Sequence, residues 1–211
     1  GVSYALPPLT APKGTVPVAQ INFTVDGAEF AEVFTIDIQG NPVNFAMRRA
    51  PWLSIARQEI GVAEIHGREH SERVMEYHNS TNSPPSTDDD SGPWCSSFCN
   101  WVMEQSGFDG TDSPGSQSWK SWGEAYDKPV YGAIAVFSYG KGKGHVAFIV
   151  GKNGRKLAML GGNQSDEVSI KLMSTGKIVK YVIPKGYAVP PFDDELSTMS
   201  NTGEANYDTT R

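Results

Sequence analysis

The sequence predicts an α+β protein in which N-terminal helices pack on a mainly antiparallel sheet. Apolar residues recur at helical spacing between residues 51 and 105, and short apolar strand patterns replace them from residue 133 onward. Helices followed by a run of strands are typical of the α+β class. Hydrophobic residues make up 38% of the 211 residues, which is enough to form a core.

Four helical segments are expected before the strands. Pro51 suits the first turn of the first segment, and Gly107 lies where a helix commonly ends in the left-handed conformation. Polar loops rich in Gly, Ser, Pro and Asp separate the later segments. The expected helices cover residues 51–59, 72–78, 93–105 and 118–126.

Five strands are expected in the second half of the chain. A Gly-rich turn at residues 139–144 separates the first two, and Asn153-Gly154 is typical of a tight turn after the second. The strands are expected at residues 133–137, 145–150, 156–160, 168–172 and 178–183.

Three segments of different character follow from these patterns. Residues 1–50 are expected to form an arm and a small β-hairpin extension, because apolar residues alternate on both sides of Asp26-Gly27. Residues 51–185 are expected to be the main domain. Residues 186–211 carry five acidic residues and one basic residue and are expected to be a flexible tail.

Composition argues against several classes of function. The net charge of −6 leaves no basic stripe for nucleic acid, and no Gly-rich phosphate-binding loop is present. No apolar stretch reaches the roughly 20 residues that a membrane span needs. No basic segment followed by an apolar one opens the chain, so no signal peptide is expected.

Cys95 is the candidate nucleophile. It follows Gly92-Pro93-Trp94 at the start of an expected helix, where free N–H groups and the helix dipole favour a thiolate and an oxyanion. Cys99 lies one helical turn further on. Because this spacing places the two Cβ atoms about 5–6 Å apart, a disulfide would be strained, and two free thiols are expected. A structural cysteine in a short apolar helix is the alternative reading of Cys95.

His145 and Asn163 complete the candidate site. His145 begins a strand after a Gly-rich turn, which suits a general base at the rim of a sheet. Asn163 follows the next strand and can accept a hydrogen bond from the second imidazole nitrogen. A surface histidine and a turn asparagine are the alternatives.

The other three histidines of the chain could instead indicate a metal site. His66, His70 and His78 lack the paired histidines of a zinc protease helix, and Gly67 interrupts the helical pattern. The triple aspartate at residues 88–90 reads as a solvated loop. No metal and no cofactor is therefore expected.

Ordered motifs across residues 51–184 resemble one family. They are Pro51-Trp52-Leu53, Gly61-Val62-Ala63-Glu64, Glu76-Tyr77-His78, Pro93-Trp94-Cys95-Ser96-Ser97-Phe98, Ser118-Trp119, Trp122-Gly123, Gly144-His145-Val146-Ala147-Phe148 and Leu160-Gly161-Gly162-Asn163-Gln164. Together they are similar to the CHAP/NlpC-like amidases of bacteria and phages, which are papain-like peptidoglycan hydrolases.

This resemblance implies a papain-like fold and a Cys95, His145 and Asn163 site. Two positions depart from the family pattern. Gly161 stands where many relatives carry a glutamate two residues before the asparagine, and Lys141 and Lys143 stand where relatives often have an aromatic residue.

The implied activity is hydrolysis of an amide bond in the cell-wall peptide, by an N-acetylmuramoyl-L-alanine amidase or an endopeptidase. Trp94, Trp119, Trp122 and Gln164 are expected to bind the substrate. Peptidoglycan is the expected partner, and a virion, a secretion machine or an immunity protein are further candidates.

A phage lysin or an antibacterial effector would act in the periplasm or the cell wall, delivered by a phage, a holin or a secretion system. A catalytically silent module of this fold, or a cysteine protease or acyltransferase acting on another substrate, are the alternatives.

Overall fold

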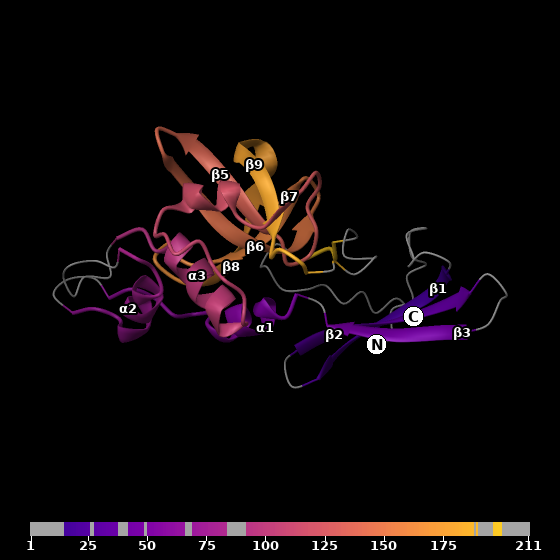
Figure 1. Ribbon diagram of the computed structural model, residues 1–211. Coiled ribbons are helices and arrows are strands. Elements are labelled where there is room, and N and C mark those ends of the chain that lie inside the picture. Colours follow the sequence, from indigo (N-terminus) through magenta and orange to yellow (C-terminus); the bar gives the residue numbers. More distant parts are fainter. Residues whose placement is uncertain are drawn as a thin grey trace.

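The computed structural model has the expected α+β architecture. It describes residues 15–25, 28–37, 42–48, 50–65, 69–83, 92–187, 189 and 196–199. Three α-helices gather on one side of a six-stranded sheet, and a separate three-stranded sheet lies beyond the end of α1 (Figure 1). The order of helices first and large sheet second is the one that the sequence predicts.

The six-stranded sheet is antiparallel throughout and has the order β4-β9-β5-β6-β7-β8. Seven consecutive residues of the central strand β6, from His145 to Gly151, are buried, so both faces of this strand are covered. The strands are β4 Glu124–Tyr126, β5 Ile134–Gly140, β6 Lys143–Asn153, β7 Lys156–Gly161, β8 Ser169–Ser174 and β9 Ile178–Ile183.

One expected helix is shorter than predicted and is followed by a strand. The segment 118–126 forms a 3-10 helix, η1 (Ser116–Ser121), and then the strand β4. Gly123 between them has a φ of 61°, and a Cβ at this position would lie 2.0 Å from the carbonyl oxygen of Ile183. The chain therefore reverses at Gly123 and pairs with β9 instead of continuing as a helix.

The three α-helices lie close to their expected positions. They are α1 (Trp52–Gln58), α2 (Glu72–Asn79) and α3 (Cys95–Gln105). The side chain of Ser71 accepts a hydrogen bond from the N–H of Val74 and so caps the start of α2. Gly107 has a φ of 80° after the end of α3, as expected for a glycine that closes a helix.

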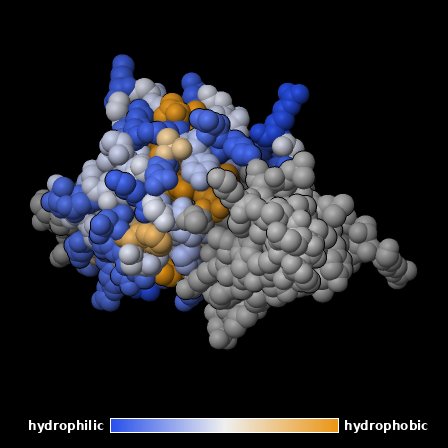
Figure 2. Space-filling model, turned by 45° about the vertical axis from the view of Figure 1, so that its right-hand side comes forward, coloured by the Kyte–Doolittle hydropathy of each residue, from blue (hydrophilic) through white to orange (hydrophobic). Residues whose placement is uncertain are grey.

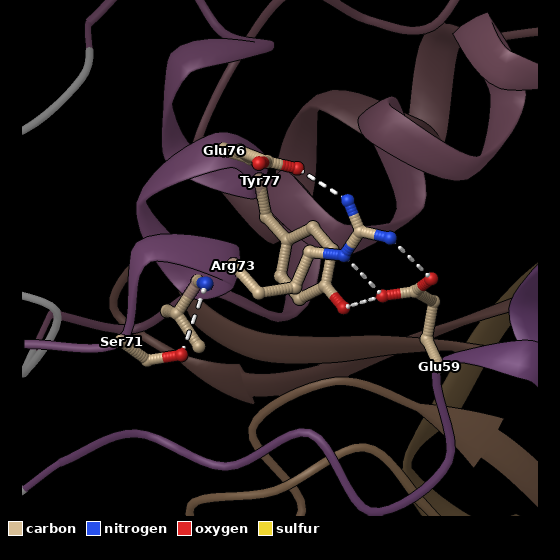
Figure 3. Close-up of polar contacts among 6 residues, drawn as sticks. Glu59, Ser71, Arg73, Glu76 and Tyr77 are labelled. Atoms are coloured by element: carbon tan, nitrogen blue, oxygen red, sulfur yellow. Dashed lines mark hydrogen bonds and ion pairs between the residues drawn. The ribbon is translucent and has the colours of Figure 1, made fainter.

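Figure 3 shows a polar cluster that joins the end of α1 to α2. The buried carboxylate of Glu59 accepts two hydrogen bonds from Arg73, at 2.8 and 3.1 Å, and one from the hydroxyl of Tyr77 at 2.5 Å. Arg73 also pairs with Glu76, and its guanidinium lies 4.8 Å from the ring centre of Trp101. A buried carboxylate needs such partners, so this cluster fixes α2 against the body of the domain.

The three-stranded sheet contains the expected hairpin and one strand more. Its strands β1 (Thr15–Val25), β2 (Ala28–Asp37) and β3 (Pro42–Arg48) pair antiparallel in that order. The third strand was not expected, because Gly40-Asn41-Pro42 indicated the end of the extension. Residues 1–14 of the expected arm and most of the expected acidic tail lie outside the described residues.

The face of the large domain that Figure 2 shows is mainly hydrophilic. Figure 2 shows one face, on which hydrophobic residues form small patches between polar ones. Among the described residues, the large hydrophobic side chains that remain exposed are Ile60, Ile65, Tyr139 and Val179. No helix in the described ranges has the length and apolar character needed to cross a membrane.

Candidate active site

Cys95 is the first residue of α3 and lies beside β6. Trp94 precedes the helix without a side-chain cap, and no acidic residue occupies the first turn. The backbone N–H groups of Val146, Ser96 and Cys95 approach the Cys95 sulfur closely enough to lower the pKa of its thiol. Because Val146 directly follows His145, this contact brings the thiol next to the strand that carries the expected base.

Burial controls the charge of the Cys95 thiol. Its side chain is 6% exposed, and this burial raises the pKa of Cys95, while the three N–H groups lower it less strongly. Desolvation of the thiolate therefore outweighs its stabilisation by the helix N-terminus, so the predicted thiolate does not form in the free protein. Around pH 7 the free protein holds a neutral thiol that needs a base to remove its proton.

His145 is also nearly buried and neutral. The residue is 9% exposed, and burial lowers the pKa of its imidazole, against a smaller opposing effect of the hydrogen bond with Gln164. A neutral imidazole has a lone pair with which it can accept a proton, as a general base must.

Gln164, rather than Asn163, contacts the imidazole. The Oε1 atom of Gln164 lies 3.2 Å from the Nε2 atom of His145. The amide nitrogen of Gln164 donates to two backbone carbonyls, those of Met159 at 3.2 Å and Ser169 at 2.5 Å. Carbonyl oxygens only accept hydrogen bonds, so these two contacts fix which end of the amide is the nitrogen.

This amide orientation determines the tautomer of His145. Since Gln164 Oε1 can only accept, the proton of neutral His145 must sit on Nε2. The Nδ1 atom then carries the lone pair and is the atom that can take a proton from a thiol. Because both N–H groups of the Gln164 amide are hydrogen-bonded, its oxygen faces His145 and favours the tautomer that a general base requires.

Asn163 has the backbone geometry of a turn asparagine, which was the alternative to its predicted role as the residue that orients His145. Its φ is 53°, in the left-handed region that asparagine tolerates better than most residues. Gly161 and Gly162 before it allow close packing, because a Cβ at Gly162 would lie 2.6 Å from Trp94 and one at Gly161 would lie 2.8 Å from Ala147. The turn places Gln164, one residue later, against His145.

The three tryptophans predicted to bind substrate differ in exposure. Trp94 and Trp119 are fully buried, with their indole nitrogens bonded to Glu64 Oε2 at 2.9 Å and to Ser96 Oγ at 2.8 Å. They are core residues and have no exposed surface with which to line a groove, so this prediction does not fit them. Trp122 is partly exposed and lines a cavity of about 360 Å³ at the far end of α3 from Cys95, together with Asp109 and Lys185.

The 3-10 helix η1 connects the two halves of the site. Trp119 bonds to Ser96, the residue after Cys95. Gln117 donates from Nε2 to the carbonyl of Phe137 at 2.8 Å, and Phe137 pairs with His145 in the β5–β6 register. One short segment therefore holds both the start of α3 and the strand pair that carries the histidine.

The histidines considered as possible metal ligands do not form a metal site among the residues that the structure describes. His78 is buried, with its Nδ1 atom 3.4 Å from Ser97 Oγ, and His66 and the aspartates at 88–90 lie outside the described residues. In the ranges that the structure covers, no three His, Cys, Asp or Glu side chains converge as metal ligands would.

A buried thiol at the start of α3 and an amide-held imidazole on the strand whose next residue approaches that thiol are compatible with a cysteine-nucleophile site. Residues 87–163 match the CHAP domain family, in agreement with the resemblance seen in the sequence motifs. This match indicates a peptidoglycan-hydrolase type of activity, directed at the cell wall. No curated protein and no solved structure showed a significant match to the chain.

Sequence reasoning assigned Gln164 to substrate and missed Gln117. The signal for Gln164 lay in the pair Gly161-Gly162, which indicates close packing, followed by an asparagine suited to a left-handed turn. If Asn163 forms a left-handed turn, residue 164 is the first whose side chain can point back toward the sheet. No sequence pattern marks Gln117, because its partner is a backbone carbonyl 20 residues away.

Proposed function

We propose that this chain is a cysteine hydrolase that cleaves an amide bond in the peptide of bacterial peptidoglycan, with Cys95 as nucleophile and His145 as base. The observation that carries the proposal is the Gln164–His145 hydrogen bond, since it leaves the imidazole Nδ1 atom free to act, one residue before the Val146 backbone that approaches the Cys95 thiol. The CHAP domain match supports the substrate class. A papain-like fold agrees with the helix and sheet order.

The proposed mechanism forms and breaks one covalent bond to sulfur. His145 Nδ1 takes the thiol proton as the Cys95 sulfur attacks the amide carbonyl carbon, and the N–H groups around Cys95 stabilise the oxyanion. The imidazolium then protonates the leaving nitrogen, and the C–N bond breaks to give a thioester. Water, deprotonated by His145, releases the acyl group and restores the thiol.

Gln164 acts in this scheme as a positioning residue. It keeps the imidazole in one tautomer and orientation and accepts the Nε2 proton of the imidazolium. Asn163, which the resemblance implied as the third residue, shapes the turn that delivers Gln164.

Residues 51–185 form the catalytic domain in this proposal, with residues 1–50 as an extension and 186–211 as a tail. The three-stranded sheet would serve to attach the enzyme to a virion or a secretion machine. A phage lysin and an antibacterial effector both agree with such an attachment.

Digestion of purified sacculi by the wild type and by Cys95→Ala tests the proposal. We expect the wild type to release soluble fragments and the variant to release none. Fragment masses name the bond, because free stem peptides indicate an amidase and shortened stems indicate an endopeptidase. If neither protein releases fragments from several wall types, the peptidoglycan assignment fails and a silent module or another substrate becomes the better account.

A further inference from the structure

The turn between β5 and β6 projects into solvent beside the candidate active site. Gly140 pairs with Lys143, so Lys141 and Gly142 form a two-residue turn. Their φ angles are 51° and 78°, which is the pattern of a type I′ turn. A Cβ at Gly140 or Gly142 would meet nothing within 4 Å, which confirms that the tip is open.

Lys141 is an unusual residue for its position. Type I′ turns favour Asn, Asp or Gly at both central residues, because other side chains are strained at positive φ. A lysine held there is less stable than asparagine or glycine would be. Backbone strain of this kind often accompanies a functional side chain.

The tip carries two exposed cations. Lys141 and Lys143 are both exposed, and neither ammonium pairs with a carboxylate among the residues that the structure describes. The sequence has no acidic residue between Asp127 and Asp166, so this strand pair carries no carboxylate of its own that would neutralise the two lysines. The two lysines are therefore available to a carboxylate that arrives from outside.

Tyr139 connects this tip to the reacting groups. Its ring centre lies 6.4 Å from that of Phe137, which in turn lies 6.0 Å from His145. Tyr139 is 52% exposed, so about half of it is accessible to a ligand. Burial of its remaining part raises the pKa of the Tyr139 phenol, and the charge of a Cys95 thiolate would raise it further.

We infer that the segment Tyr139–Gly144 is a recognition element for an anionic peptide stem, with Tyr139 packing on the peptide and Lys141 and Lys143 binding a free stem carboxylate. This inference rests on the proposed function and names the substrate class that it favours. Stems whose carboxylates are amidated lack the charge and bind more weakly.

The test compares two muropeptides that differ solely in a free or an amidated stem carboxylate. The variant Lys141→Asn/Lys143→Gln removes both charges, and asparagine suits the type I′ turn better than lysine does, so the fold is retained. Lys156→Gln is the matched control, because Lys156 pairs with Asn153 at the opposite end of β6 from His145.

We expect the wild type to favour the free carboxylate about fivefold in KM, with kcat nearly equal for the two substrates. The double variant should lose this preference and keep kcat, and Lys156→Gln should retain both. An undiminished preference in the double variant would overturn the inference.

Binding of the same two muropeptides to Cys95→Ala, measured by calorimetry, separates this inference from the proposed hydrolysis. If the wild type cleaves nothing but Cys95→Ala binds the free carboxylate form more tightly through Lys141 and Lys143, the hydrolase proposal fails and the recognition element stands. Equal binding of both muropeptides contradicts the recognition element whether or not hydrolysis is seen.

Discussion

At the scale of single residues, the site depends on the protonation of two buried groups. The pKa of His145 lies below its ordinary value of about 6.5 because burial disfavours the imidazolium. Protonated His145 cannot take the thiol proton, so activity should fall as the pH drops through this lowered pKa. We expect the acidic limb of kcat/KM to have its midpoint below pH 6.5.

Gln164→Glu reverses part of this shift. A carboxylate in place of the amide oxygen would stabilise the imidazolium, so the acidic limb should move to higher pH. The pH dependence of kcat/KM for the variant and the wild type measures the effect. A limb that stays in place would show that residue 164 does not contact the base during catalysis.

A second residue-scale prediction separates Gln164 from its neighbour. Gln164→Leu removes the acceptor for His145 Nε2–H and should lower kcat by about 10- to 100-fold, because the tautomer and ring orientation are no longer fixed. Asn163→Gly keeps the left-handed turn at φ 53° and should change kcat by less than about threefold. The opposite order would assign the orienting role to Asn163, as the family resemblance implied.

At the scale of elements, η1 sets the distance between α3 and the β5–β6 pair. Gln117→Met keeps the shape of the side chain but removes its hydrogen bond to the Phe137 carbonyl. We expect a loss of about 1–2 kcal/mol in the free energy of unfolding and a lower kcat with little change in KM. Lys120→Met changes an exposed residue of the same 3-10 helix and should alter neither quantity.

The cluster between α1 and α2 gives a stability prediction. Arg73→Ala leaves the buried Glu59 carboxylate with Tyr77 as its remaining described partner, and should cost about 1–3 kcal/mol, less than for a fully buried pair because Arg73 is 43% exposed. Glu76→Ala removes the exposed partner of the same arginine and should cost less than about 0.5 kcal/mol. Urea unfolding of both variants measures the difference, and equal costs would show that Glu59 contributes no more than a surface pair.

At the scale of the whole molecule, the sequence predicted the α+β class of the fold and two residues of the candidate site. Hydrophobic periodicity located α1, α2, α3 and the strands from β5 to β9 to within a few residues, because these elements bury one or both faces in a common core. Cys95 and His145 could be identified because each follows a distinct local signal, a helix start and a Gly-rich turn.

Other features depend on contacts between distant segments and could not be predicted locally. The hydrogen bond of Gln164 to His145 spans 19 residues, and that of Gln117 to Phe137 spans 20. The burial of Trp94 and Trp119 depends on how α3, η1 and the sheet pack together. The local sequence around a tryptophan in a short helix is the same whether its indole packs in a core or lines a groove, so the sequence alone cannot distinguish the two.

The most direct test of the central claim is the intact mass of the protein, acid-quenched shortly after mixing with a cleavable muropeptide. We predict a transient gain equal to the acyl part of the substrate, mapped to the peptide of Cys95, with Cys99→Ala giving the same adduct and Cys95→Ala giving neither adduct nor product. Product release at the wild-type rate by Cys95→Ala would contradict the account, because hydrolysis would then proceed without this thiol.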